Sequence, residues 1–92
     1  MATIHMNVEA CNNTATAIGA AKSSMEEQIG TLTSNVSAVV GADWIAPSAT
    51  EFQSAYQEWT NTMKQLMEQL ATLQQRLTAE ISEFEQTAAK LA

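Results

Sequence analysis

Two long apolar stripes, separated by one short break, limit the folds that this chain can adopt. In each stripe apolar residues recur every three or four positions, the spacing that places side chains on one face of an α-helix. The first stripe includes Ile18, Met25, Ile29, Leu32 and Val36. The second stripe includes Phe52, Tyr56, Trp59, Met63, Leu66, Leu70, Leu73 and Leu77. The pattern predicts two helices, over about residues 7–40 and 48–90, in a single domain of residues 1–92.

The composition supports an all-α fold. Of the 92 residues, 46% are hydrophobic but only 5% are aromatic, and the chain has 3 glycines and 1 proline. So few aromatic and turn-forming residues favour helix over sheet. Gly19 lies inside the first predicted helix, where glycine costs about 1 kcal/mol relative to alanine. It is either tolerated there or needed for the close approach of another helix.

The segment GADWIAPSATEF interrupts the helical pattern near the middle of the chain. Gly41 suits the position just after the C-terminus of a helix. Pro47 keeps the preceding residue, Ala46, out of the α conformation, so one helix cannot run through the segment. The first helix is therefore expected to end at this point.

A second helix is predicted to begin directly after the proline. Ser48 and Glu51 match a capping box, in which each side chain accepts a hydrogen bond from the backbone N–H of the other residue. With its turn at residues 41–47, the short link between two long amphipathic helices predicts an antiparallel hairpin.

A hairpin alone would leave much of both stripes exposed to water, which is unfavourable for large apolar side chains. Two hairpins that pair about a two-fold axis would bury the stripes in a four-helix bundle. The sequence therefore predicts a dimer. A homodimer is its simplest form, while a heterodimer or a larger ring stays open.

The charge of the chain limits its partners. The formal net charge is -6 and the isoelectric point is near 4.4, so nucleic acids and anionic membrane surfaces would repel the chain. No apolar run marks a transmembrane span or a signal peptide. A leaderless chain that binds neither nucleic acid nor membrane is expected.

Residues that could carry catalysis or hold a cofactor are sparse. His5 is the only histidine, and no clustered cysteines complete a metal site around it. Cys11 lies on the first stripe and is expected to pack as a small apolar side chain, the alternative being an intermolecular disulfide or a reactive thiol. No phosphate-binding loop or nucleophile motif appears. We therefore expect no catalytic, cofactor-binding or metal-binding residues, and no enzyme.

Three aromatic residues carry a resemblance to a known family. Trp44 stands in the link, Phe52 follows eight residues later, and Trp59 follows after seven more. In this pattern, and over nearly its whole length, the chain resembles the WXG family, small proteins similar to the early secreted antigenic target of mycobacteria. The resemblance implies a helical hairpin that pairs with itself or with a second WXG-like protein. It also implies a substrate of type VII secretion, cytoplasmic before export and extracellular afterwards, that acts by binding.

The turn departs from the family motif at one position. The motif is Trp, any residue, Gly, whereas this chain has Trp44, Ile45 and Ala46. Because Ala46 precedes Pro47, an extended backbone is expected there, which alanine adopts without strain. The resemblance makes these four residues candidates for recognition by the secretion machinery, whose ATPase is an implied partner.

The tail departs from the family more strongly. Actinobacterial members often carry a tyrosine, three residues and then Asp or Glu near the C-terminus, and the secretion ATPase reads this signal. The only tyrosine here is Tyr56, and the nearest imitation, Phe84 with Ala88, lacks the hydroxyl and the carboxylate. Either export uses another signal or a partner supplies it. The alternative function is a cytosolic adaptor or chaperone that pairs with a larger type VII effector.

The two tryptophans are expected to differ in role. Trp59 falls on the second stripe and is expected to be structural and buried. Trp44 lies off both stripes and has two interpretations, which are compatible. Its ring either caps the end of the bundle by packing against Val40 and Phe52, or it is partly exposed as a docking contact.

Overall fold

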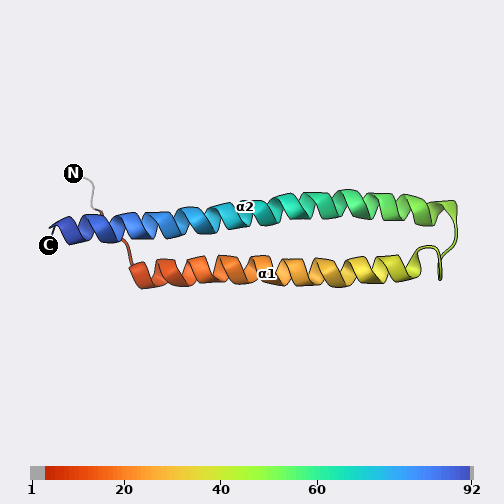
Figure 1. Ribbon diagram of the computed structural model, residues 1–92, viewed down its shortest axis with the longest axis horizontal. Helices are drawn as coiled ribbons and strands as arrows, with labels where there is room; N and C mark the ends of the chain where they lie inside the picture. The colour runs from red at the N-terminus through yellow and green to blue at the C-terminus, as the bar shows by residue number, and fades with distance from the viewer. Residues whose placement is uncertain (1–3, 92) are drawn as a thin grey trace.

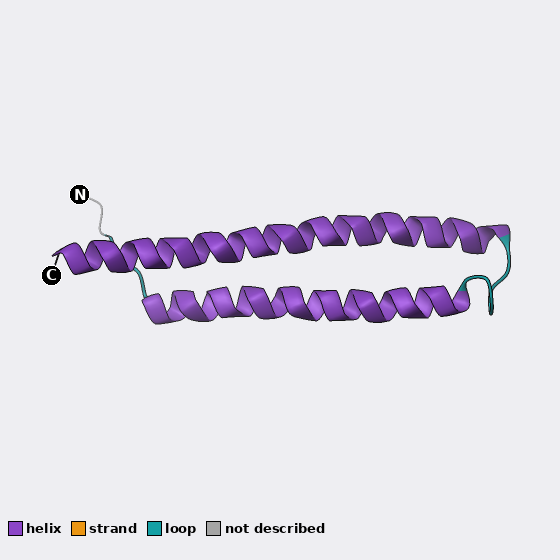
Figure 2. Cartoon of the chain, viewed as in Figure 1, coloured by secondary structure: helices purple, strands orange, loops and turns teal. Residues whose placement is uncertain are grey.

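The structure, a computed structural model, describes residues 4–91, which form two long helices joined by a turn. Helix α1 spans Val8–Val39 and helix α2 spans Pro47–Leu91 (Figure 1). The helices pack side by side and antiparallel, with all of the regular structure helical (Figure 2). The predicted all-α hairpin is confirmed. Residues 1–3 and 92 of the predicted domain lie outside the described residues.

The molecule is a rod, with dimensions of 69 × 21 × 15 Å. Each helix has only the other as a neighbour, so the hairpin encloses no layered core. Helix α2 is also the longer helix, and its C-terminal turns extend past the start of α1 (Figure 1). Burial is therefore confined to the line along which the helices touch.

Asn7 sets the start of α1. Its backbone is extended (φ -81°, ψ 96°), and its side-chain oxygen accepts a hydrogen bond from the Ala10 N–H at 3.0 Å. This is an N-cap, and Glu9 in the first turn adds a favourable charge at the positive end of the helix dipole. The helix consequently begins one residue after the cap.

The capping box predicted at Ser48 and Glu51 is wrong. Helix α2 begins at Pro47, so Ser48 already lies inside the first turn and cannot cap it. Proline suits the first helical position because its fixed φ is helical and its missing N–H would have no partner there. The Ala49 N–H donates to the Ala46 carbonyl at 3.0 Å and closes the turn.

The contact line between the helices, here called the seam, is built mainly on one row of side chains on α1 and on two rows on α2. Its most buried members among the described residues are Ala15, Ile29, Ala49, Met67 and Ile81. Ala15, Ile29 and Ala49 belong to a row with intervals of seven, which half-buried residues continue, namely Lys22 and Val36 on α1 and Tyr56, Met63, Leu70, Leu77 and Phe84 on α2. Met67 and Ile81 belong to the second row of α2, four residues after the first. A repeat of seven corresponds to 3.5 residues per turn, the period of coiled coils.

Two polar contacts across the seam fix its register. The Tyr56 hydroxyl lies 2.9 Å from Thr33 Oγ1 and donates to the Ile29 carbonyl at 3.4 Å. The Gln74 side-chain amide donates to the Ala15 carbonyl at 2.9 Å. Thr33 and Ala15 are separated by the same number of residues as Tyr56 and Gln74, so the register is constant along this part of the hairpin.

Gly19 makes room for the second of these contacts. A Cβ atom added there would lie 2.5 Å from Gln74 Nε2, closer than non-bonded atoms can approach. What approaches Gly19 closely is therefore the end of the Gln74 side chain and not the backbone of α2. By contrast, a Cβ added at Gly30 would meet nothing within 4 Å.

These two glycines give a matched test of the seam. We expect Gly30→Ala to raise the free energy of unfolding by about 1 kcal/mol, the helix-propensity gain. Gly19→Ala should lower it by about 1 kcal/mol or more, since overpacking and the lost Gln74 hydrogen bond outweigh the same gain. Adding Gln74→Ala to Gly19→Ala should recover part of the loss. Thermal melts at one protein concentration measure this, and equal stabilisation by both alanines would refute the close packing.

Candidate functional site

The turn between the helices is closed by backbone hydrogen bonds around one carbonyl. The N–H groups of residues 42–44 all donate to the Val39 carbonyl, at 2.9 to 3.3 Å. The Gly41 N–H donates back to the Trp44 carbonyl at 3.0 Å. Gly41 has φ +89°, a conformation that favours glycine, as its predicted position after the helix requires. Four backbone hydrogen bonds therefore hold the turn in a defined shape.

This turn holds the Trp44 ring at the end of the rod. The ring packs against Phe52 with a centroid separation of 5.7 Å and an angle of 50° between the planes. About a third of Trp44 remains exposed, and the neighbouring Ile45 is 80% exposed. Trp44 thus has the cross-hairpin contact of one interpretation and the partial exposure of the other.

A hollow opens beside the Trp44 ring, here called the turn hollow. Its wall is almost wholly apolar, and it is lined by Asn35, Val36, Val39, Val40, Trp44 and Phe52. Of the other turn residues, Ala46 is half-buried and Pro47 is exposed. Such a wall binds by apolar contact and offers few groups for polar recognition.

The second predicted stripe divides into two rows in the structure. One row lies in the seam. The other row points away from α1, and it consists of Phe52, Trp59, Leu66 and Leu73, with exposed fractions of 47%, 43%, 42% and 55%. Trp59 touches Tyr56, at a ring separation of 5.7 Å, but it is not buried within the hairpin. The expected burial of Trp59 is therefore not provided by the single chain.

Helix α1 carries a matching row on the same side of the rod. Leu32 and Val39 are 44% and 41% exposed, and Ile18 and Met25, at the same seven-residue spacing, are half-buried. In both helices these residues follow a seam residue by three positions. In an antiparallel pair of helices, two rows that follow the seam rows by the same number of positions lie on the same side of the pair. The two rows together form one surface, here called the apolar face.

The opposite side of the seam is more polar. Residues that follow the first seam row by four positions include Glu26, Thr33, Gln53, Thr60 and Gln74, together with the buried Met67 and Ile81. Thr33 and Gln74 make the contacts that cross between the helices. Lys22 in the seam reaches Glu26 at 2.7 Å, an ion pair within one helix. The hairpin is consequently one-sided, with a single large apolar face.

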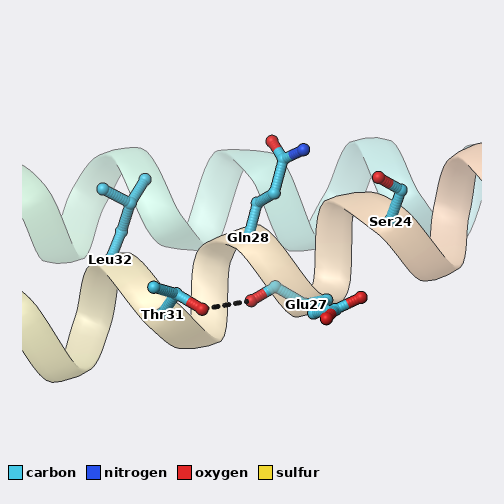
Figure 3. Close-up of a pocket in the computed structure, with 5 residues that line it drawn as sticks. All are labelled: Ser24, Glu27, Gln28, Thr31 and Leu32. Carbon is cyan, nitrogen blue, oxygen red and sulfur yellow. Dashed lines mark hydrogen bonds between the residues drawn. The ribbon is translucent and has the colours of Figure 1, made fainter.

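A second, shallow hollow lies on α1 beside the apolar face (Figure 3). It is lined by Ser24, Glu27, Gln28, Thr31 and Leu32, and the Thr31 hydroxyl donates to the Glu27 carbonyl at 3.2 Å. Its polar groups come from separate turns of an exposed helix. This arrangement brings no nucleophile and base together.

The residues considered for chemistry are dispersed. His5 is exposed near the start of α1, and Cys11 is a free, half-buried thiol. Among residues 4–91 no three metal-ligating side chains come together. Within the same range, neither helix carries an apolar stretch that could cross a bilayer. What the described surface offers is the apolar face and the turn.

The hairpin, with a tryptophan held in its turn, can now be set beside known proteins. A model of the family described as proteins of 100 residues with WXG (WXG100) matches residues 3–89. The chain belongs to this family. WXG100 proteins are small helical proteins associated with type VII secretion, and they typically pair with each other. No curated protein and no solved structure matches the chain.

The departure from the WXG100 motif at Ala46 has a local explanation. No described residue other than glycine has a positive φ, and Gly41 is the glycine that does. The third position of the motif therefore needs no left-handed backbone in this protein. Alanine fits there because the residue with the left-handed backbone, Gly41, lies before the tryptophan.

Sequence reasoning missed two features of this site. The division of the second stripe has a signal in the sequence, the spacing of seven from Phe52 to Leu73. This signal is hidden when residues three and four apart are read as a single stripe. The turn hollow has no such signal, because it arises from packing between the turn and both helices.

Reciprocal substitutions in the turn test this account. We expect Gly41→Ala to lower the free energy of unfolding by about 1 kcal/mol, because the left-handed backbone is strained for alanine. Since nothing lies within 4 Å of an added Cβ, the effect is one of backbone strain and not of crowding. Ala46→Gly should also destabilise, by about 0.5 kcal/mol, through the entropy of the unfolded chain. Unchanged melting of Gly41→Ala would show that the turn is not held in this conformation.

Proposed function

We propose that this WXG100 protein is a substrate of type VII secretion that is exported as a folded dimer and acts by binding proteins. The observation that carries the proposal is the family match over residues 3–89 on a hairpin with one exposed apolar face. In this proposal residues 1–92 act as one domain, and no catalytic residue or cofactor takes part. The protein is cytoplasmic before export and extracellular afterwards.

The apolar face supports the pairing. From Phe52 to Leu73 it runs for about 30 Å along α2, at 1.5 Å per residue. Six large apolar side chains on it are between 41% and 55% exposed, namely Leu32, Val39, Phe52, Trp59, Leu66 and Leu73. Stable interfaces bury roughly 1,600 Å² in total, and two such faces in contact are of that order. The partner in the proposal is a second copy, with a second WXG100 protein as the alternative.

The turn supports a separate contact with the secretion ATPase. Trp44 and Ile45 present apolar surface at the tip of the rod, beyond the main part of the apolar face. A contact there leaves the pairing surface free. The C-terminal turns of α2 extend past the start of α1 and are the other accessible end (Figure 1). Because they lack the tyrosine and the acidic residue of the family signal, the proposal places more of the recognition on the turn.

An adaptor or chaperone for a larger effector is the second candidate. The missing tail signal favours it, because a partner would then supply the signal for export. Purification from the native host distinguishes the two candidates. A lone homodimer argues for the substrate, and a stable complex with a larger type VII effector argues for the adaptor.

Light scattering tests the pairing. We expect a dimer at micromolar concentration, and Trp59→Ala should weaken its association by about 2 kcal/mol or more, because a central aromatic residue of an interface is lost. Ile45→Ala is the matched control, since it removes an exposed apolar side chain that lies outside the apolar face. It should leave the dimer unchanged. A folded wild-type monomer at these concentrations would rule out the proposed dimer.

An export assay tests the role of the turn. We expect Ile45→Ser to reduce secretion about tenfold or more, as the loss of a contact at an interface hot spot would, while helicity and the dimer are retained. Ile45 is the cleanest variant because it does not line the turn hollow. Trp44→Ala should also reduce export, and Asn61→Ser, on the exposed side of α2, should not. Normal export of both turn variants would exclude this recognition surface. Wild-type protein that stays in the cytosol while other substrates leave would exclude the secreted role.

A further inference from the structure

We infer that residues 8–22 of α1, here called the strap, open from α2 as a unit while the turn half of the hairpin stays folded. The opening uncovers apolar side chains on the C-terminal half of α2, at the end of the rod away from the turn. It is a property of the single hairpin, so it goes beyond the proposed function and holds with or without pairing and export. Three observations carry it: a charge in the seam, the small side chains of the strap, and the contact that holds the strap.

Lys22 interrupts the seam near the middle of the rod. It occupies the first seam row of α1, and among the described residues it is the only charged member of the seam rows. The register set by the two polar contacts places it level with Met67. Its ammonium group bonds to Glu26 of the same helix, at 2.7 Å, and its side chain is 34% exposed. A lysine at a seam position of paired helices costs stability, so Lys22 separates the apolar contacts on its two sides.

The strap contributes only small apolar side chains to the first seam row. Between Val8 and Ile29, about 30 Å along the helix, no apolar side chain of that row is larger than Ala15. The larger Ile18 lies beside the seam, on the apolar face. Gly19, in the same stretch, lowers the helix propensity further. A helix as short as the strap is marginal in water on its own, so the strap melts when it leaves α2.

A single hydrogen bond joins the strap to α2 within the described residues. It runs from the Gln74 amide to the Ala15 carbonyl, at 2.9 Å. On the other side of Lys22 the Tyr56 hydroxyl contacts both Thr33 and the Ile29 carbonyl, and the turn joins the helices covalently. Separation that begins at the open end of the hairpin therefore breaks only the Gln74 contact and the packing of the strap.

Release of the strap uncovers side chains on α2 that are larger than those of the strap. The register places Ile81, which is 3% exposed, level with Val8, and the half-buried Leu77 and Phe84 lie in the same stretch of seam. Because exposure of these side chains is unfavourable, the open form is a minor population. The strap thus covers an apolar strip that is distinct from the apolar face, whose α2 row ends at Leu73.

Native-state hydrogen exchange tests whether the strap opens by itself. Mass spectrometry of the full chain compares the amides of residues 8–22 with those of residues 29–39, which lie in the same helix. After correction for intrinsic rates, we expect the strap amides to exchange at least about tenfold faster. Equal protection of the two segments would overturn the inference. Light scattering on the same sample reports the pairing separately, so a monomer would remove the proposed dimer and leave this test intact.

Variants that weaken one side of Lys22 show whether the strap is a separate unit. Tyr56→Phe removes the hydroxyl contacts of the turn half, which stay formed when only the strap opens. It should therefore speed the exchange of residues 29–39 about fivefold and leave residues 8–22 unchanged. Ile29→Val, which trims a buried side chain of the turn half, should act in the same way. Equal acceleration of both segments by these variants would show that the hairpin opens only as a whole.

The reciprocal variant acts on the strap. Gln74→Ala should speed the exchange of both segments about fivefold, because its contact is lost in partial and in complete opening alike. Gln75→Ala, at the exposed neighbouring position, is the matched control and should change neither segment. Strap exchange that is unaffected by Gln74→Ala would show that the strap is not held by this contact.

Lys22 gives the test in the opposite direction. We expect Lys22→Met to slow the exchange of the strap about tenfold, because an apolar side chain of similar length then joins the seam. Lys64→Met, at an exposed position of α2, is the matched control and should leave strap exchange unchanged. Unaltered strap exchange in Lys22→Met would overturn the assignment of Lys22 as the boundary of the strap.

Discussion

The seam between α1 and α2 buries mainly one row of side chains on α1 and two rows on α2, and the remaining features of the molecule follow from that narrow contact. A seven-residue repeat places these rows of each helix against the other helix. The chain carries apolar residues at a second repeat, three positions after the first, and the hairpin has no third element to cover them. The exposed row from Phe52 to Leu73 is therefore a consequence of the architecture. It is buried only if another chain supplies the missing surface.

Polar contacts decide which side of the seam is left apolar. Tyr56 with Thr33, and Gln74 with the Ala15 carbonyl, cross between the helices on one side and satisfy the polar groups placed there. Gly19 is needed for the second contact because any Cβ would displace the Gln74 amide. These contacts hold the two helices at one register. That register in turn aligns the row of Leu32 and Val39 with the row of Phe52 and Trp59, so that two separate rows become one face.

The sequence was sufficient to predict the two helices, the break between them, the position of Gly41 just after the first helix and the family. These depend on periodicity and on local backbone chemistry, which are readable without a structure. The start of α2 was predicted wrongly because Ser48 and Pro47 both suit the beginning of a helix, and the proline took the first helical position. The exposure of Trp59 was not foreseen, because residues three apart on the second stripe divide between the seam and the apolar face. The turn hollow could not be predicted, since its walls come from three separate segments.

A tryptophan in a turn would ordinarily expose a large apolar ring at a cost in stability, and this turn limits that cost. Three N–H groups converge on the Val39 carbonyl and hold the backbone of the turn. The Trp44 ring packs against Phe52 and forms one wall of the turn hollow. Because Gly41 takes the positive φ, the motif position after Ile45 accepts alanine. The requirement for glycine and the requirement for an exposed aromatic surface are met by different residues, which allows the motif to change at Ala46 while Trp44 keeps its place.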